Sequence, residues 1–281
     1  MESFYLTLPC SVKGLFHENV LSDYVTHLPR TIELEDKWEV ALVEFHFTKS
    51  WYNVEKEFMV GITNASKSFH IYTTDKITPG KYTAKHLISE INRLLLSMGD
   101  EDVKPPKIIL DPASNHVNID PGFTRKIKKE VVVPVFDDEL FELLGLTNRI
   151  TKTNEYHISN NEPYDDKDLE SIVPIHEELI KGPFFGETPF DAECGIHSIF
   201  IYCDIVEENL IGDSSVQCLR VCTLPQANFG ETINITFDQP HYLPLSRRSF
   251  NSLRVTLKDK TNEQIKFRFG ETLIKLHFKK C

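Results

Sequence analysis

The chain has 281 residues, 41% of them hydrophobic, and a formal net charge of −11. This length allows a substantial core, whereas the acidic balance argues against general binding to duplex DNA or anionic membranes, which requires clustered lysine and arginine. Phenylalanine is abundant, with 19 residues against 12 glycines, and aromatic residues favour strands over helices.

The N-terminal part predicts strands. A short strand at residues 4–9 ends at Pro9, and a second is expected at residues 24–28. The strongest is residues 38–47, where both alternating sets of side chains are largely apolar, as in a strand buried on both faces. Two more are expected at residues 58–62 and 68–73.

A change of period then predicts a helix. Apolar residues recur three and four apart between Thr83, a suitable N-cap, and Gly99, a suitable stop. Residues 107–111 and 116–120 predict a hairpin, and residues 131–136 a strand placed at a sheet edge because it contains Pro134. Asp137 is expected to cap a short helix that Gly145 closes.

Residues 151–191 carry no periodic pattern and are rich in acid and proline, which indicates a long loop. The C-terminal third then predicts a closely spaced ladder of strands, at residues 196–206, 219–224, 231–237, 250–258, 264–269 and 272–278. We therefore expect a mainly β protein: a single jelly-roll β-sandwich formed by residues 1–55 and 195–281, with residues 56–194 inserted as an α+β lobe with two helices.

The chemistry-bearing residues favour structural roles over reactive ones. Cys218 and Cys222 would share one strand face, but at a separation too large for one zinc ion, so buried packing is the preferred interpretation. His241 is interpreted as structural. The carboxylates at 137–139 fit helix capping, and those at 165–168 lack the glycine and distal glutamate of a calcium loop. Trp51 and Tyr52 could stack a base or sugar, but core packing is favoured. The sequence thus predicts no catalytic residues, cofactor or metal site, and no enzyme.

The six cysteines are scattered, and we expect free thiols in a reducing compartment. Neither a signal peptide nor an apolar run long enough to span a membrane is recognised, and no sequence-specific binding to nucleic acid is expected.

Several short segments are distinctive: FYLTLP at 4–9, WEVALVE at 38–44, SWYN at 50–53, YCDIVE at 202–207, GD at 212–213, LRVCTL at 219–224, PHYLPL at 240–245 and LHF at 276–278. In these segments the chain resembles a set of small proteins encoded by the virus-like Polinton or Maverick transposons of animals and by their adintovirus relatives. The resemblance extends over most of the chain apart from 151–191.

This resemblance implies a minor capsid protein of the penton type. Such proteins have a single jelly roll, assemble as homopentamers, and close the five-fold vertices of a shell whose major protein is a double jelly roll. The chain would then belong to a virion capsid and be made in the cytoplasm or nucleus of a host cell. The alternative that the sequence leaves open is a receptor- or carbohydrate-binding β-sandwich, such as a spike or fibre component.

Overall fold

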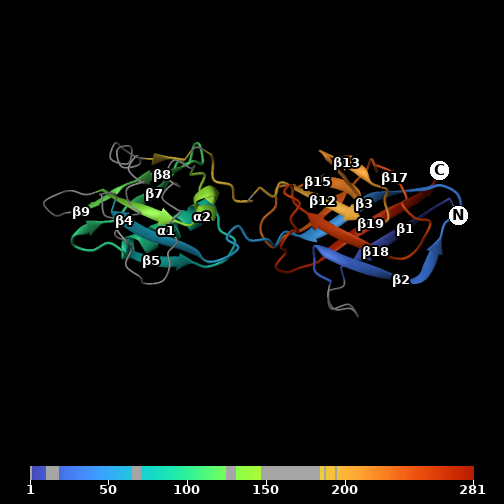
Figure 1. Ribbon diagram of the computed structural model, residues 1–281, viewed down its shortest axis with the longest axis horizontal. Coiled ribbons are helices and arrows are strands. Elements are labelled where there is room, and N and C mark those ends of the chain that lie inside the picture. The colour runs from blue at the N-terminus through green and yellow to red at the C-terminus, as the bar shows by residue number, and fades with distance from the viewer. Residues whose placement is uncertain are drawn as a thin grey trace, which may run out of the picture. The chain divides into compact units, whose positions relative to one another are not determined.

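The computed structural model describes residues 2–10, 19–64, 71–124, 131–146, 184–186, 188–193 and 195–281. The chain divides into two compact units, one formed by Met1–Trp51 with Gly195–Cys281 and the other by Tyr52–Cys194. The first boundary falls after Trp51, where the sequence placed it after residue 55. Both termini belong to the first unit (Figure 1).

The first unit contains eight principal strands. In chain order they are β1 (Ser3–Pro9), β2 (Asp23–Glu33), β3 (Trp38–Thr48), β12 (Ser198–Cys203), β15 (Cys218–Thr223), β16 (Thr232–Thr236), β18 (Ser249–Lys258) and β19 (Thr272–Lys280). They form two sheets, ordered β1-β19-β3-β16 and β15-β12-β18-β2. The short β17 (Leu243–Pro244) adds to β3, and β13 (Asn209–Ile211) pairs with β14 (Ser214–Val216) as a separate hairpin.

The pairing of these strands defines the fold. The first strand pairs with the eighth, the second with the seventh, the third with the sixth and the fourth with the fifth, all antiparallel. A long hairpin wound upon itself gives this order, which is the order of a jelly roll. The predicted jelly-roll sandwich is therefore confirmed, and the second unit is inserted between its third and fourth strands.

Alternation along the strands explains the core. On β19, Ile274, Leu276 and Phe278 are fully buried, while the residues between them face outward. Phe278 stacks on Phe4 of β1 and on Phe250 of β18, with ring centroids 4.7 Å and 5.7 Å apart. The interior between the two sheets is thus filled with aromatic and aliphatic side chains.

The second unit has its own core. One sheet runs β5 (Ile71–Ile77), β4 (Phe58–Asn64), β10 (Val131–Phe136), β9 (Gly122–Thr124), β6 (Val103–Lys104), and a smaller one runs β11 (Phe184–Phe185), β8 (Val117–Asp120), β7 (Lys107–Leu110). Helix α1 (Ala84–Ser97) buries its apolar face in this core, and α2 (Asp138–Leu143) follows β10. The Thr83 hydroxyl accepts from the His86 N–H, as the capping prediction required.

Two sequence-based expectations about the strands are wrong. Residues 264–269 form no strand; they make single hydrogen bonds to different neighbours, Ile265 N–H to Leu257 and Arg268 N–H to Ser50. Strand β10 lies inside its sheet, not at the edge. Proline is tolerated there because the pairing with β9 covers only Val131 and Val132 and ends before Pro134.

At α2, Asp137 occupies the N-cap position, as expected, but its side chain makes no capping bond. Its carboxylate accepts instead from the Met59 N–H at 2.6 Å, which ties the start of the helix to β4. Gly145 closes the helix with a φ of 71°, as expected.

Candidate functional site

The cysteines are packing residues. Cys203, Cys218 and Cys222 are buried free thiols, as expected from the sequence. Burial raises the pKa of Cys203 and Cys222 to about 12 and that of Cys218 to about 11. At neutral pH these thiols stay protonated, the form that neither attacks electrophiles nor binds metals.

The expectation that Cys218 and Cys222 share a strand face is wrong. The register between β12 and β15 shifts at Ile201 and Tyr202, so Leu219 and Cys222, three residues apart, both reach the core. Cys218 pairs with Tyr202, which alternates with the core residues Ile201 and Cys203 and so faces outward. A one-residue irregularity has moved Cys218 to the other face.

The other residues that the sequence singled out are a buried tryptophan, an exposed histidine and charged clusters outside the described residues. Trp51 is 1% exposed, which confirms core packing and excludes its ring from stacking a ligand at the surface. His241 is exposed in the loop before β17. Within the described ranges, no three His, Cys, Asp or Glu side chains are grouped to hold a metal ion. The carboxylates at 165–168, the basic residues at 125–129 and most of the acidic stretch 151–191 lie outside the described residues.

A ring cluster lies on the outer face of the β1-β19-β3 sheet. Tyr5 of β1 stacks on its cross-strand partner His277, with centroids 4.4 Å apart and planes 20° apart. The Tyr242 hydroxyl lies 2.8 Å from Nδ1 of the same imidazole. We call Tyr5, His277 and Tyr242 the ring patch.

Two lysines flank the ring patch. The ammonium of Lys275 lies 5.5 Å from the Tyr5 ring centroid, and that of Lys279 lies 5.0 Å from the Tyr242 centroid. Lys275 also pairs with Glu44 at 2.8 Å, and this pair holds the pKa of the Glu44 carboxyl below its usual value. Tyrosine is enriched in the cores of protein interfaces, whereas lysine is depleted there. A lysine ammonium over an aromatic ring is attracted to the ring face.

A second outward feature is the hairpin β13–β14, at the end of the sandwich that β19 reaches at Lys279. Its Leu210 side chain is 78% exposed. Glu207 and Glu208 precede it and Asp213 lies in its turn, while the sequence contains no lysine or arginine between Glu207 and Leu219. We call residues 207–216 the acidic arm.

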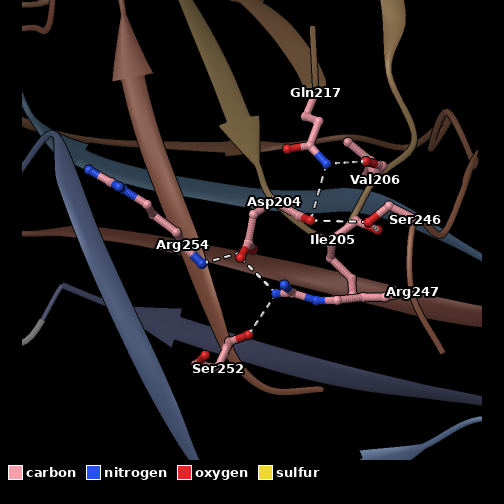
Figure 2. A network of polar contacts seen from close by, with 8 residues as sticks. All are labelled: Asp204, Ile205, Val206, Gln217, Ser246, Arg247, Ser252 and Arg254. Atoms are coloured by element: carbon pink, nitrogen blue, oxygen red, sulfur yellow. Dashed lines mark hydrogen bonds and ion pairs between the residues drawn. The ribbon is translucent and has the colours of Figure 1, made fainter. Parts of the chain in front are cut away.

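The base of the acidic arm is fixed by Asp204 (Figure 2). Its carboxylate accepts from the Arg254 N–H at 2.9 Å and pairs with the Arg247 guanidinium at 2.6 Å. Its backbone carbonyl accepts from the side chains of Gln217 and Ser246, at 3.3 Å and 3.1 Å. Because both the start and the end of the arm are tied to this one residue, the hairpin projects from a well-defined position.

Sequence reasoning missed the ring patch and the arm as surface features. The signal for the patch was available in the alternation of β19, whose outward positions are Lys275, His277 and Lys279. Nothing in the sequence indicated that Tyr242, two strands away in chain order, would meet His277.

Comparison with known proteins gives structural neighbours alone. No protein-family model matches the chain, and no curated protein does. Among solved structures it is similar to the mavirus penton protein, at 14% identity over 99% of each chain and a TM-score of 0.48. It is also similar to a chain of the Sputnik virophage, at 11% identity over 100% of this chain and 98% of that one, again with a TM-score of 0.48. The assignment of the fold rests on the strand pairing described above.

Proposed function

We propose that this protein is a structural subunit of a virus-like icosahedral capsid, of the penton type, which forms a homopentamer at the five-fold vertices. The observation that carries the proposal is the complete jelly-roll pairing of the eight strands of the first unit. Jelly rolls are a common architecture of viral capsid proteins. The sequence resemblance to the Polinton, Maverick and adintovirus group supports the same role.

The interior of the sandwich agrees with a structural role. Inward positions on β3 and β19 are occupied by Phe45, Phe47, Ile274, Leu276 and Phe278, all fully buried. The space between the sheets therefore holds packed side chains, and the surface is where this unit presents groups to a partner.

No helix in the described ranges is both long and apolar enough to cross a membrane.

The partners in this proposal are further copies of the chain and a double-jelly-roll major capsid protein. A ring of five identical subunits requires a head-to-tail contact that closes after five repeats. The absence of enzymatic activity remains a prediction from the sequence.

Co-assembly with the major capsid protein tests the role. We expect electron microscopy to show shells with density at the five-fold vertices when both proteins are present, and open vertices when this chain is omitted. Shells that close fully without it, and that never retain it on sedimentation, would contradict the proposal. Binding to a glycan array that depends on Tyr5 would favour the receptor-binding alternative.

A further inference from the structure

The two most exposed large apolar side chains in the described part of the jelly-roll unit are Leu210, 78% exposed, and Tyr5, 61% exposed. Leu210 belongs to the acidic arm and Tyr5 to the ring patch. Each is surrounded by charge of opposite sign to the other, with Glu207, Glu208 and Asp213 on the arm and Lys275 and Lys279 beside the patch.

Tyr5 and the acidic arm lie at opposite flanks of the sandwich, whereas Tyr242 lies on the arm's side of β3, two residues before Pro244. Strand β2 lies over β1, because the Tyr24 hydroxyl donates to the Leu8 carbonyl at 3.2 Å. On the other flank β15 lies beside the end of β16, where the Arg220 guanidinium carbon is 3.9 Å from the Phe237 ring centroid. The acidic arm connects β12 to β15, whereas Tyr5 is on β1, so the arm and Tyr5 point from different flanks.

The two features also lie at the same end of the sandwich. The Glu207 N–H donates to the Pro244 carbonyl at 2.9 Å, Pro244 pairs with Glu39, and Glu39 pairs with Lys279. A chain of backbone contacts thus joins the base of the arm to the end of β19. Complementary groups at one level on opposite flanks of a subunit are the arrangement that a closed ring of identical subunits requires.

We propose that the occupant of the ring patch is the acidic arm of a second copy of this chain, and that this contact closes the ring. Leu210 of one subunit packs on the Tyr5–His277 stack of its neighbour. Lys279, whose ammonium already lies over Tyr242, faces the arm carboxylates. Lys275 contributes less because Glu44 neutralises it. This inference rests on the proposed function, since it assigns the contact within that ring.

The first test compares the oligomeric state of Leu210→Ser, Tyr5→Ser and Lys279→Glu with that of the wild type. Leu96→Ser on α1 is the matched control, because Leu96 is 71% exposed and lies in the other unit. Losing the burial of one leucine or tyrosine at each contact is expected to weaken association about tenfold or more. The control should assemble as the wild type does, and circular dichroism should show that each variant is folded.

The second test locates the contact directly. Tyr5→Cys and Leu210→Cys are made separately and together in a background that lacks Cys194 and Cys281, and are treated with a short bismaleimide cross-linker. The double variant should give a covalent ladder that ends at the ring size, and the two single variants should cross-link when mixed but not alone.

The possible outcomes distinguish the inferred contact between Leu210 and Tyr5 from the proposed function as a ring-forming capsid subunit. If Leu210→Cys cross-links to itself, the arms meet each other and the inferred contact is wrong. If rings form, the serine variants assemble as the wild type does and the cysteine variants give no cross-links, the contact lies elsewhere and only this inference is wrong. If the wild-type chain stays monomeric at high concentration and in the presence of the major capsid protein, the proposed function fails with it.

Discussion

Asp23 and Arg254 face each other across β2 and β18 as a two-point ion pair, with Nε 2.8 Å from Oδ1 and Nη2 2.5 Å from Oδ2. Thr256 and Gln264 donate to the same carboxylate at 3.1 Å and 3.3 Å. The pair therefore joins β2, an edge strand, to its neighbour and to the segment that follows β18.

The pair predicts a specific dependence of stability on pH. The hydrogen bonds from Arg254 hold the pKa of Asp23 below its usual value, so the folded state binds this proton less readily than the unfolded state. The stabilisation is fully present above the unfolded value of about 3.9 and is lost as pH falls through the lower folded value. Asp23→Asn should cost about 1 kcal/mol at neutral pH, since Arg254 is largely exposed.

Urea denaturation between pH 2 and 7 tests this prediction. The difference between wild type and Asp23→Asn should shrink below about pH 4. Glu90→Gln, which removes the exposed Glu90–Arg93 pair of α1, is the control and should show a smaller difference. A difference that stays constant through the acid range would show that Asp23 acts by packing and not by charge.

Asp204 is expected to matter more for the acidic arm than any charge within the arm. Asp204→Ala removes the acceptor for the Arg254 N–H and for Arg247, and should destabilise the protein by about 1–2 kcal/mol. Hydrogen exchange of the amides at 209–216 should accelerate at the same time. Asp213→Ala is the control, because in the described contacts its carboxylate accepts only from the adjacent Ser214. Equal effects of the two substitutions would contradict the role given to Asp204.

The glycines of two turns offer a matched comparison. Gly270 and Gly212 both have positive φ, 96° and 62°, but a Cβ on Gly270 would lie 2.3 Å from the Cβ of Thr48, while a Cβ on Gly212 meets nothing within 4 Å. Gly212→Ala should cost about 1 kcal/mol from backbone strain alone. Gly270→Ala should cost about 2 kcal/mol or more, because the contact with Thr48 adds to the strain. Thermal unfolding of both variants measures this, and equal costs would show that β3 yields at Thr48.

Cysteine labelling tests the assignment of the thiols to packing. With iodoacetamide at pH 8 and peptide mapping by mass spectrometry, the exposed Cys281 should be modified in the native protein. Cys203, Cys218 and Cys222 should be modified only after denaturation, because they are buried and their thiols remain protonated at this pH. Rapid native labelling of Cys218 would show that its face of β15 opens to solvent.

Sequence patterns predicted most of the helices and strands because the spacing of apolar residues indicates which face of each element is buried. The alternation of Ile274, Leu276 and Phe278 predicts β19, and Thr83 with the apolar face of residues 84–97 predicts α1. The same rule fails at residues 264–269. Ile265 is buried there, as the apolar pattern predicts. The backbone of this segment, however, makes hydrogen bonds to two separate segments, at Leu257 and at Ser50, and forms no ladder with either. Apolar period reports which side chains are buried, not which strand the backbone pairs with.

The surface features were harder to predict, because they depend on contacts between distant segments. Tyr5, Tyr242 and His277 come from three places in the chain, and only the winding of the jelly roll brings them together. The acidic arm that carries Leu210 likewise begins just after Asp204, whose carboxylate is held by Arg247 and Arg254 from distant parts of the chain. The local sequence pattern therefore predicts the strands of such a fold, whereas its surface clusters depend on which distant strands the topology brings together.

The mass of the assembled protein in solution tests the central claim most directly. Native mass spectrometry or mass photometry of the full-length wild-type chain should give a species of five subunits, which becomes dominant as concentration rises. A chain that remains monomeric at every concentration, or that assembles as a trimer, would contradict the account of a five-fold vertex protein.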